Sequence, residues 1–294
     1  MVLIFTTGIG FLMMLSIHYT LFLVTISTAL LGAAAGALGV YIFLRKQSLM
    51  TDAISHATLP GIILFFLIFQ TNNPLLLMTG GMITGMLGSV FVSYVHATTR
   101  LSIDALLGVV LSVFFGCGLV LMTQLQKTVC ARQAVLNKFL FGNAALLLQS
   151  DLMFILPVVI FVLISIWLYS RMFQLYVFNK EYAQVLGFNT ALINTTLTGL
   201  LLLVVAVGLS VVGVILMSTL IVAPGVAARQ WSSRCNKVVI LAAFFGAASA
   251  VIGSYISSID VHMPTGPIIA VVSITWTCIS LLIAPHRGIL WHAR

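Results

Sequence analysis

Two side chains that can bind a metal cation stand one helical turn apart near the start of an apolar segment. They are Asp52 and His56, in the stretch Asp52-Ala-Ile-Ser-His56-Ala-Thr-Leu-Pro60-Gly61. On a helix, positions i and i+4 leave the same face. A carboxylate and an imidazole placed in this way can hold a divalent cation jointly, or can pair with each other and fix the helix. From these residues alone, both interpretations are open.

Two prolines predict bends in the segments that would carry a pathway. Pro60 has no N–H to donate to the carbonyl of His56, so the helix should kink there and leave that oxygen free beside the imidazole. Pro224 has the same relation to the carbonyl of Leu220 in a later segment. We expect both bends to line a pathway, since freed backbone groups at membrane depth need a cavity or protein around them.

The composition is that of a membrane protein. Of the 294 residues, 61% are hydrophobic and only 6% are charged, whereas a soluble domain has about 25% charged residues. The net charge of +8 does not indicate nucleic-acid binding, because the basic residues are scattered in short loops and form no stripe. The four cysteines lie far apart without a CxxC pair, which argues against a thiolate metal cluster and a disulfide scaffold.

The apolar windows predict an all-α, polytopic helical bundle that forms a single transmembrane domain over residues 1–294. A span needs about 20 residues, and about nine windows meet that length, with a range of eight to ten. They lie near residues 20–44, 52–70, 75–96, 103–124, 151–169, 191–209, 211–228, 238–257 and 266–284. Residues 1–19 are apolar without a basic region, and either form an interfacial segment or extend the first span.

The basic residues predict the orientation of the bundle. With nine spans, one side carries ten of the 13 basic residues: Arg45, Lys46, Arg100, Arg171, Lys180, Arg229, Arg234, Lys237, Arg287 and Arg294. The other side carries Lys127, Arg132 and Lys138. The positive-inside rule makes the first side cytoplasmic. The N-terminus is therefore expected outside and the C-terminus inside.

The longest inner loop, residues 172–190, contains a predicted short amphipathic helix. It covers Asn179–Phe188 and ends at Gly187 as the C-cap. Tyr182, Val185 and Leu186 form one apolar face beside Lys180 and Glu181. Such a face needs burial, either in the lipid headgroups or against a cytoplasmic protein.

Small residues at i and i+4 predict close helix crossings in three segments. The pairs are Gly32 and Gly36, Gly81 and Gly85, and Gly246 and Ala250. We interpret them as packing within the bundle, with a seam between subunits as the alternative. Asp104, at the start of the fourth window, is interpreted as an acid that favours a helix N-terminus. Asp260 and His262 in an outer loop are interpreted as solvated, with a weak metal entry site as the alternative.

The stretch from Leu44 to Gly61 resembles the signature of the membrane permeases of bacterial ABC importers for zinc, manganese and iron. Further stretches match this family in order along roughly residues 20 to 285. They are Ile103-Asp-Ala-Leu-Leu-Gly108, Phe139-Leu-Phe-Gly142, Glu181-Tyr-Ala-Gln-Val-Leu-Gly187, Val212 to Arg229 and Pro264-Thr-Gly-Pro267. The chain departs from the family at Asn143, where the family often has an acid, so no ion contact is expected at that position.

The resemblance implies a permease that works in an assembly. Two permease subunits, identical or paralogous, pair around a central pathway, two ATP-binding ABC subunits dock beneath them, and an extracytoplasmic protein delivers the metal. Asp52 and His56 would contact the transported Mn, Zn or Fe ion, with no permanently bound cofactor. The loop from Lys180 to Gly187 would be the coupling helix that meets the ATPase. Its contact residues would be Glu181, Tyr182, Ala183, Val185, Leu186 and Gly187.

Two other functions are compatible with a membrane bundle. A permease for a metal chelate, of the siderophore or cobalamin type, would not need an inward Asp–His pair. An intramembrane metal-dependent enzyme would usually need further ligands such as HExxH, which the sequence lacks. The sequence also lacks a Walker motif, so ATP hydrolysis is expected from a separate ATPase subunit and not from this chain.

Overall fold

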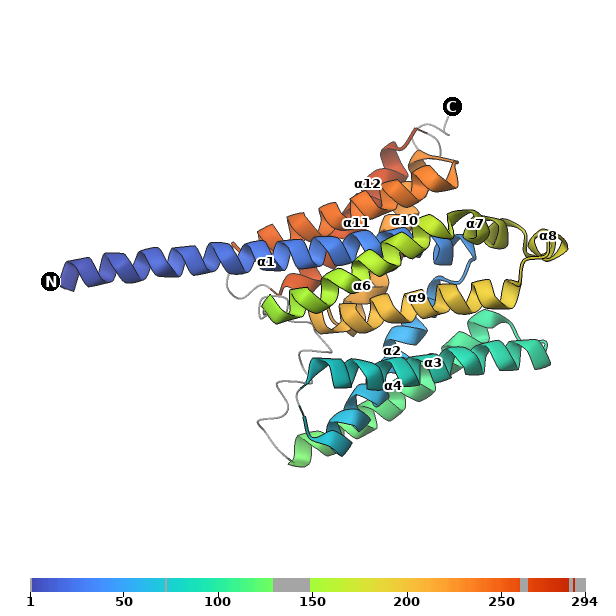
Figure 1. The fold of residues 1–294 in the computed structure, drawn as a ribbon, viewed down its shortest axis with the longest axis horizontal. Coiled ribbons are helices and arrows are strands. Elements are labelled where there is room, and N and C mark those ends of the chain that lie inside the picture. The colour runs from blue at the N-terminus through green and yellow to red at the C-terminus, as the bar shows by residue number, and fades with distance from the viewer. Residues whose placement is uncertain (1, 72, 129–148, 260–263, 286–287, 289–294) are drawn as a thin grey trace.

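The computed structural model of the chain describes residues 2–71, 73–128, 149–259, 264–285 and 288, and these residues form helices and no strand (Figure 1). In chain order the helices are α1 (Val2–Leu44), α2 (Ser48–Phe69), α3 (Pro74–Thr98), α4 (Ile103–Thr128), α6 (Gln149–Leu168), α7 (Ser170–Phe178), α8 (Lys180–Val185), α9 (Thr190–Val211), α10 (Val214–Trp231), α11 (Cys235–Ser257) and α12 (Thr265–Ile283). The predicted all-helical class is confirmed for this part of the chain.

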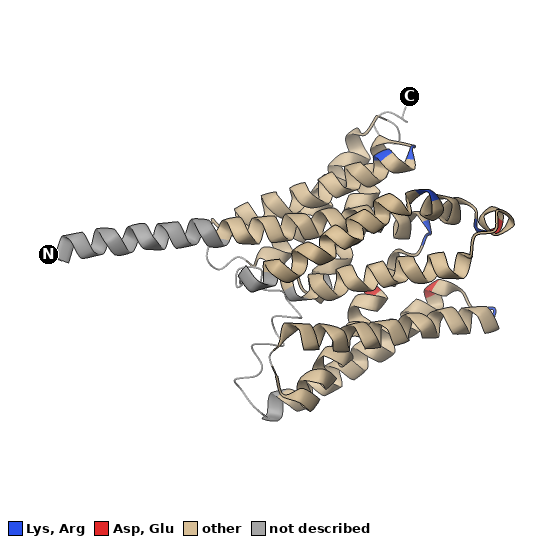
Figure 2. Ribbon diagram, in the orientation of Figure 1, with Lys and Arg blue, Asp and Glu red and all other residues tan. Residues whose placement is uncertain are grey.

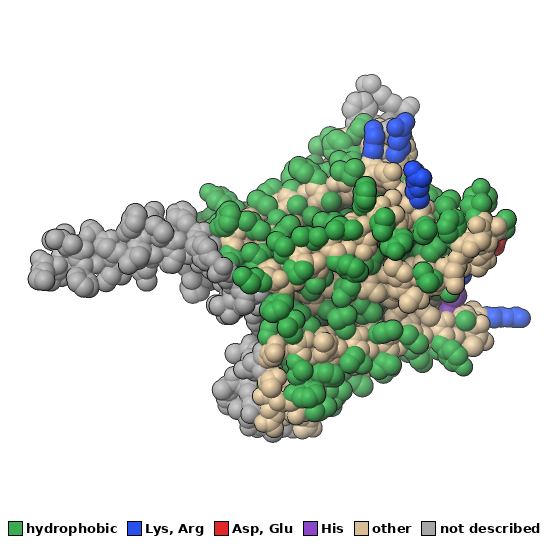
Figure 3. Space-filling model, in the orientation of Figure 1, with side chains coloured by type: hydrophobic (Ala, Val, Ile, Leu, Met, Phe, Trp, Pro, Cys, Tyr) green, Lys and Arg blue, Asp and Glu red, His purple; other side chains and the backbone are tan. Residues whose placement is uncertain are grey.

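Seven of the described helices are long and apolar enough to cross a membrane, or eight if a bent pair counts as one span. The bent pair is α6 and α7, which meet at an angle of 66°. Each of the nine predicted windows falls on a helix, but α10 has only 18 residues and is not among the seven. Hydrophobic side chains cover the visible flanks of the bundle, as a lipid-facing surface requires (Figure 3). A count of about nine spans stays a prediction.

The first helix extends well past the rest of the bundle at its N-terminal end (Figure 1). With 43 residues, α1 is about 65 Å long, roughly twice the thickness of the hydrocarbon core. Residues 2–19 are helical and lead into the first candidate span, Leu21–Leu44. The interfacial segment and the extension of the span both stay predictions.

The described Lys and Arg side chains gather at one end of the bundle, opposite the N-terminal end of α1 (Figure 2). All eight of them belong to the set of ten that the charge pattern assigned to one side. The C-terminal end of α12 lies at this basic end as well, where Ser280 contacts the last turns of α10. The separation of the two ends agrees with the prediction, while the side that faces the cytoplasm stays a prediction from the charge rule.

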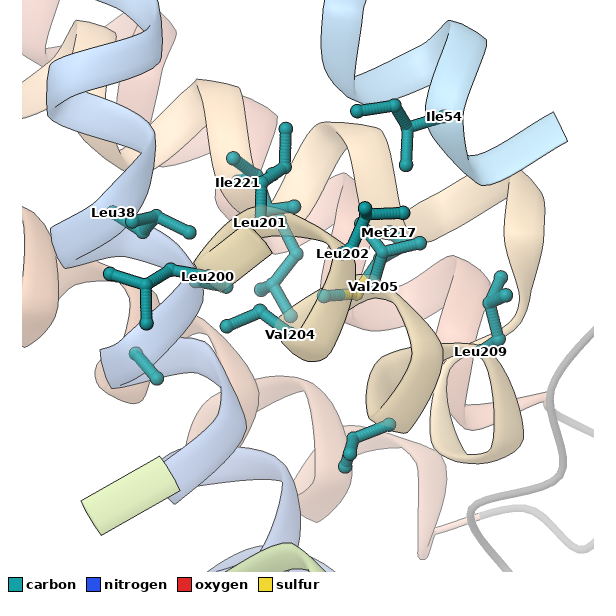
Figure 4. Packing of buried hydrophobic residues seen from close by; sticks show 14 of the residues in the cluster. Leu38, Ile54, Leu200, Leu201, Leu202, Val204, Val205, Leu209, Met217 and Ile221 are labelled. Atoms are coloured by element: carbon teal, nitrogen blue, oxygen red, sulfur yellow. The ribbon is translucent and has the colours of Figure 1, made fainter. Parts of the chain in front are cut away.

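The core of the bundle is built around α9 (Figure 4). Leu200, Leu201 and Val205 on this helix are buried almost completely. They pack between Leu38 of α1 and Ile221 of α10 (Figure 4). A helix that is apolar on every side is expected at such a central position. The turn into α10 is tight, because Gly213 adopts φ +89°, which favours glycine.

Small residues allow the helices to approach at their backbones. A Cβ added at Gly32 of α1 would lie 2.5 Å from the carbonyl oxygen of Gly246 in α11, and one at Gly36 would lie 2.4 Å from that of Ala242. The Gly81 and Gly85 positions of α3 face side chains of α2 and α9. The interpretation of these small residues as packing within the bundle is therefore confirmed.

Replacing Gly246 by Val should destabilise the bundle. A Cβ at this position lies 2.1 Å from the carbonyl oxygen of Gly32, so α1 and α11 have to separate. We expect a loss of about 1–3 kcal/mol, seen as a lower midpoint of thermal unfolding in detergent. Gly199→Ala is the matched control, since nothing lies within 4 Å of its Cβ. An unchanged midpoint for Gly246→Val would contradict this packing.

Several predictions fall outside the described residues. These are the outer segment with Phe139 to Gly142 and Asn143, and the pair of Asp260 and His262. Met263, in the stretch before α12, lies outside as well. Pro264 and Thr265 are described, and Pro264 occupies the N-cap position of α12 as a helix-starting turn should.

Candidate functional site

Asp52 and His56 lie on one face of α2, as their spacing predicts. The His56 Nε2 atom is 3.6 Å from Asp52 Oδ1. The Asp52 side chain keeps 37% of its surface exposed in the single chain, whereas that of His56 keeps 14%. The two groups are thus close enough to act together, and the carboxylate is open on one side.

The spacing of the two atoms fits joint binding of a metal ion. The N···O distance of 3.6 Å is longer than a hydrogen bond between these groups. A transition metal about 2.1 Å from each atom would subtend an angle of about 120° there. Such an angle is close to that of tetrahedral and trigonal coordination. The two side chains would therefore need to move little from their positions in the ion pair to bind a metal ion.

Beyond its contact with Asp52, the imidazole of His56 is held by packing. Its ring meets that of Phe115 on α4 edge-on, with centroids 4.6 Å apart. Its other nitrogen, Nδ1, is buried and has no hydrogen-bond partner among the described residues. Histidines in tight metal sites usually donate from that nitrogen to an acceptor. A site without this support should bind more weakly, which suits an ion that has to leave again.

One chain supplies only part of a coordination sphere. The described residues contain no group of three or more His, Cys, Asp or Glu side chains that could hold a metal. A transition-metal site usually has four or more ligands. Asp52 and His56 therefore need further ligands, from a second permease subunit, a backbone oxygen or water.

The two prolines lie inside their helices and are buried. The helix α2 runs without a break through Pro60, which contacts the position of Gly118 on α4. Pro224 in α10 lies against Gly36 of α1, with its Cβ 3.3 Å from the position of an added Cβ. Both prolines thus sit at helix contacts within the chain. Their role in lining a pathway stays a prediction.

A cavity among the described residues opens on another face of α2. It has a volume of about 750 Å³ and is lined by Ala53, Ile54 and Ala57 of this helix. Asp52 and His56 do not line it. The two side chains therefore lie on a different face of α2 from this cavity.

The predicted short helix in the inner loop is confirmed as α8, and its capping explains its length. The Asn179 side chain accepts a hydrogen bond from the backbone N–H of Tyr182 at 2.9 Å. At the other end Gly187 adopts φ +83°, and the N–H of Phe188 reaches the carbonyl of Ala183 at 3.1 Å. These are the bonds of an N-cap and of a glycine C-cap. The helix is limited to six residues by its own sequence.

The predicted apolar face of α8 is exposed, while its docking on a partner stays a prediction. Val185 keeps 84% of its surface exposed, Tyr182 53% and Leu186 50%. Glu181 is exposed beside them. Ala183 is completely buried, so it fixes α8 to the bundle and cannot reach a partner itself. The region 172–190 is also less of a loop than predicted, because α7 fills its first part as a helix up to Phe178.

Two other features near the site could not be identified from local sequence patterns. Phe115 is one of 19 phenylalanines, and only the crossing of α2 and α4 identifies it as the neighbour of His56. Arg45 was assigned only to a loop. It packs over the Tyr176 ring and donates to Asn194 at the end of the bundle. The only signal for Arg45 in the sequence was its position at the start of the stretch from Leu44 to Gly61.

Known membrane transport proteins are similar to this chain over most of its length. The zinc transport system membrane protein TroC of Treponema pallidum is 40% identical over 280 residues, which are 95% of this chain and 94% of that protein. The manganese transport system membrane protein MntC of Bacillus subtilis is 35% identical over 89% of this chain. The matched part is 60% of that longer protein.

The fold is similar to a solved structure. The structure of PsaBC from Streptococcus pneumoniae in complex with Fab superposes with a TM-score of 0.80 at 27% identity. The match covers 92% of this chain and 94% of that one. Residues 17–284 match the profile of the ABC 3 transport family. The family resemblance predicted from the motifs is therefore confirmed, and the chain belongs to the ABC 3 transport family of membrane permeases.

Proposed function

We propose that the chain is the permease subunit that carries a divalent transition metal ion across the bacterial plasma membrane. The observation that carries this proposal is the Asp52–His56 pair, 3.6 Å apart on a helix of a multi-pass bundle. Ionisable groups in such helices are costly, so they usually mark an ion pathway. Relatives at 40% and 35% identity are named for transport of zinc and of manganese.

The ligand types limit the cargo. A carboxylate oxygen together with an imidazole nitrogen suits Mn, Fe(II) or Zn, whereas Ca and Mg prefer oxygen ligands only. Two permease subunits that meet along this face of α2 would bring two carboxylates and two imidazoles to one ion. The partner subunit can be a second copy or a paralogue, because each needs only to supply one such pair.

The two ends of the bundle indicate where the remaining partners would bind. We place the basic end in the cytoplasm by the positive-inside rule, so that α8 faces a separate ATPase subunit there. The exposed Val185, Tyr182 and Leu186 would seat in that ATPase. Nucleotide-driven closure of the ATPase would move α8, and the bundle would rock between two states that open the site to one side at a time. An extracytoplasmic binding protein would deliver the ion at the opposite end.

Metal uptake tests the cargo class. In cells that lack their own importers, we expect the full system with this chain to take up at least one of Mn, Zn and Fe(II) supplied as simple salts. Competition between the three salts then identifies the preferred ion, because they would share the Asp52–His56 site.

A chelate permease would give a different pattern in the same cells. A bulky organic chelate would be taken up while a large excess of the simple salts failed to compete. That outcome would contradict the proposal of a bare ion as cargo, without affecting the membership of the family.

A further inference from the structure

A cavity that the metal site does not use opens at the basic end of the bundle. Its volume is about 750 Å³, and it lies between α2, α3 and α4 on one side and α7, α8 and α9 on the other. Its deeper wall is apolar, with Ile54, Leu107 and Val110. Its polar lining includes Arg45, His96 and Lys180. The cavity therefore combines an apolar wall with side chains that carry or can take a positive charge.

Arg45 is the most firmly held of these side chains. Its Nη2 donates to Asn194 Oδ1 at 2.7 Å, and its guanidinium lies over the Tyr176 ring at 5.1 Å from the centroid. Burial lowers the pKa of Arg45 from its ordinary value, although an arginine stays protonated in proteins. Neither Asn194 nor Tyr176 carries a negative charge. The fixed guanidinium thus has no counter-ion among these contacts.

Two buried polar atoms at this place have no partner. Arg45 Nη1 and Gln47 Oε1 are both buried, and neither makes a hydrogen bond among the described residues. Leaving such atoms unpaired is costly, most of all for a charged group. Rotating the Gln47 amide by 180° exchanges its oxygen with its NH₂ group. Arg45 Nη1 and the Gln47 amide can then both donate a hydrogen bond. Arg45 and Gln47 both line the cavity, so an acceptor bound there would lie beside both side chains.

The charges around the cavity favour an anion. Of the three acidic side chains that the structure describes, Asp52, Asp104 and Glu181, none lines it. His96 donates from Nδ1 to the carbonyl oxygen of Leu101 at 3.2 Å, so Nε2 of the neutral ring is an acceptor, and the donors assigned to an anion are those of Arg45 and Lys180. Lys180 is exposed and can turn its ammonium group inward. A metal cation would meet repulsion here.

Hydroxyl groups complete the polar lining. Ser89 and Ser93 of α3 and Thr190 of α9 line the cavity. Thr190 Oγ1 accepts a hydrogen bond from Gln184 Nε2 at 3.1 Å, so its own proton is free to be donated. A guanidinium together with hydroxyl donors is the usual environment of a phosphate in proteins.

We propose that this cavity is a binding site for a phosphate group, held by Arg45 and Lys180. The group can belong to a phospholipid of the adjacent leaflet, whose acyl chain would follow the apolar wall, or to free inorganic phosphate. Lys180 is the first residue of α8, and Arg45 directly follows α1. A phosphate bound by both side chains therefore connects the short helix to the bundle. Occupancy of the site would then stiffen the element through which we expect the ATPase to act.

Binding measurements on the purified full-length chain test this proposal without any transport assay. The probes are dioleoylphosphatidylglycerol, with dioleoylphosphatidylcholine as the lipid without net charge, and radioactive inorganic phosphate. Lipid binding is measured by native mass spectrometry of delipidated protein, and phosphate binding by equilibrium dialysis. The variants are Arg45→Gln and Lys180→Gln. The matched control is Arg100→Gln, which removes an exposed arginine of the same end that does not line the cavity.

We expect saturable binding of one phosphate-bearing probe, weakened about tenfold or more by Arg45→Gln and unchanged by Arg100→Gln. Preference for phosphatidylglycerol over phosphatidylcholine identifies a lipid, whereas saturable uptake of inorganic phosphate alone identifies a soluble ligand. Lys180→Gln, at an exposed position, should weaken binding even if Arg45→Gln unfolds. The proposal is overturned if neither probe saturates, or if Lys180→Gln and Arg100→Gln bind as wild type does.

Discussion

Replacing Asp52 by Asn should abolish metal uptake while the protein keeps its fold. The substitution preserves the size of the side chain but removes the charge that faces His56 Nε2. Loss of groups that only support a metal ligand costs about 10- to 100-fold in affinity, so loss of a ligand should reduce the initial uptake rate at least about 100-fold. Uptake of radioactive manganese or zinc in cells without other importers measures this, and His56→Gln should behave in the same way.

Asp104→Asn is the matched control for this experiment. It also removes one carboxylate, but from the exposed first turn of α4. We expect near-normal uptake with this variant, because its acid acts only on a helix terminus, an effect of about 0.3–1 kcal/mol. Co-purification with the ATPase should be unaffected in all three variants. Normal uptake by both Asp52→Asn and His56→Gln would contradict the proposal that these two side chains bind the transported ion.

The candidate site shows what the sequence could and could not predict. The i and i+4 spacing placed Asp52 and His56 together, since helix geometry alone determines that relation. The distance of Phe115 from the imidazole depends on how α4 crosses α2, and no local pattern encodes that crossing. The cavity at Arg45 depends in the same way on how six helices, from α2 to α9, pack together.

The fold likewise has features that local sequence signals predict and features that they do not. The capping residues Asn179 and Gly187 predicted the ends of α8 because caps are local signals. The end of α1 at Leu44 agrees with the predicted window 20–44, and Lys46 takes the left-handed conformation there, with φ +58°, in place of a glycine. The bend of 66° between α6 and α7 had no glycine or proline at the junction either, so it was predicted as a simple loop.

Replacing Val185 by Asp should uncouple the permease from its ATPase. Val185 is the most exposed apolar residue of α8, and a buried anchor of an interface typically contributes about 2 kcal/mol or more. An uncompensated carboxylate in that contact should weaken ATPase binding roughly 30-fold or more. The affinity is measured between the purified permease assembly and its ATPase, and metal-dependent ATP hydrolysis should fall with it.

Leu101→Asp provides the control at the same end of the bundle. Leu101 is also an exposed apolar residue, in the connection between α3 and α4, but it is not part of α8. We expect ATPase binding close to that of wild type with this variant. Equal losses with Val185→Asp and Leu101→Asp would show that the effect is not specific to α8. Wild-type affinity with Val185→Asp would mean that the apolar face of α8 rests in lipid headgroups.

Anomalous X-ray scattering from a manganese- or zinc-loaded crystal of the assembled permease tests the central claim most directly. A permease that moves a bare ion past Asp52 and His56 should show a peak within about 2.3 Å of Asp52 Oδ1 and His56 Nε2, and the peak should vanish in Asp52→Asn. A metal peak elsewhere among the membrane helices, with none at these two atoms, would contradict the account.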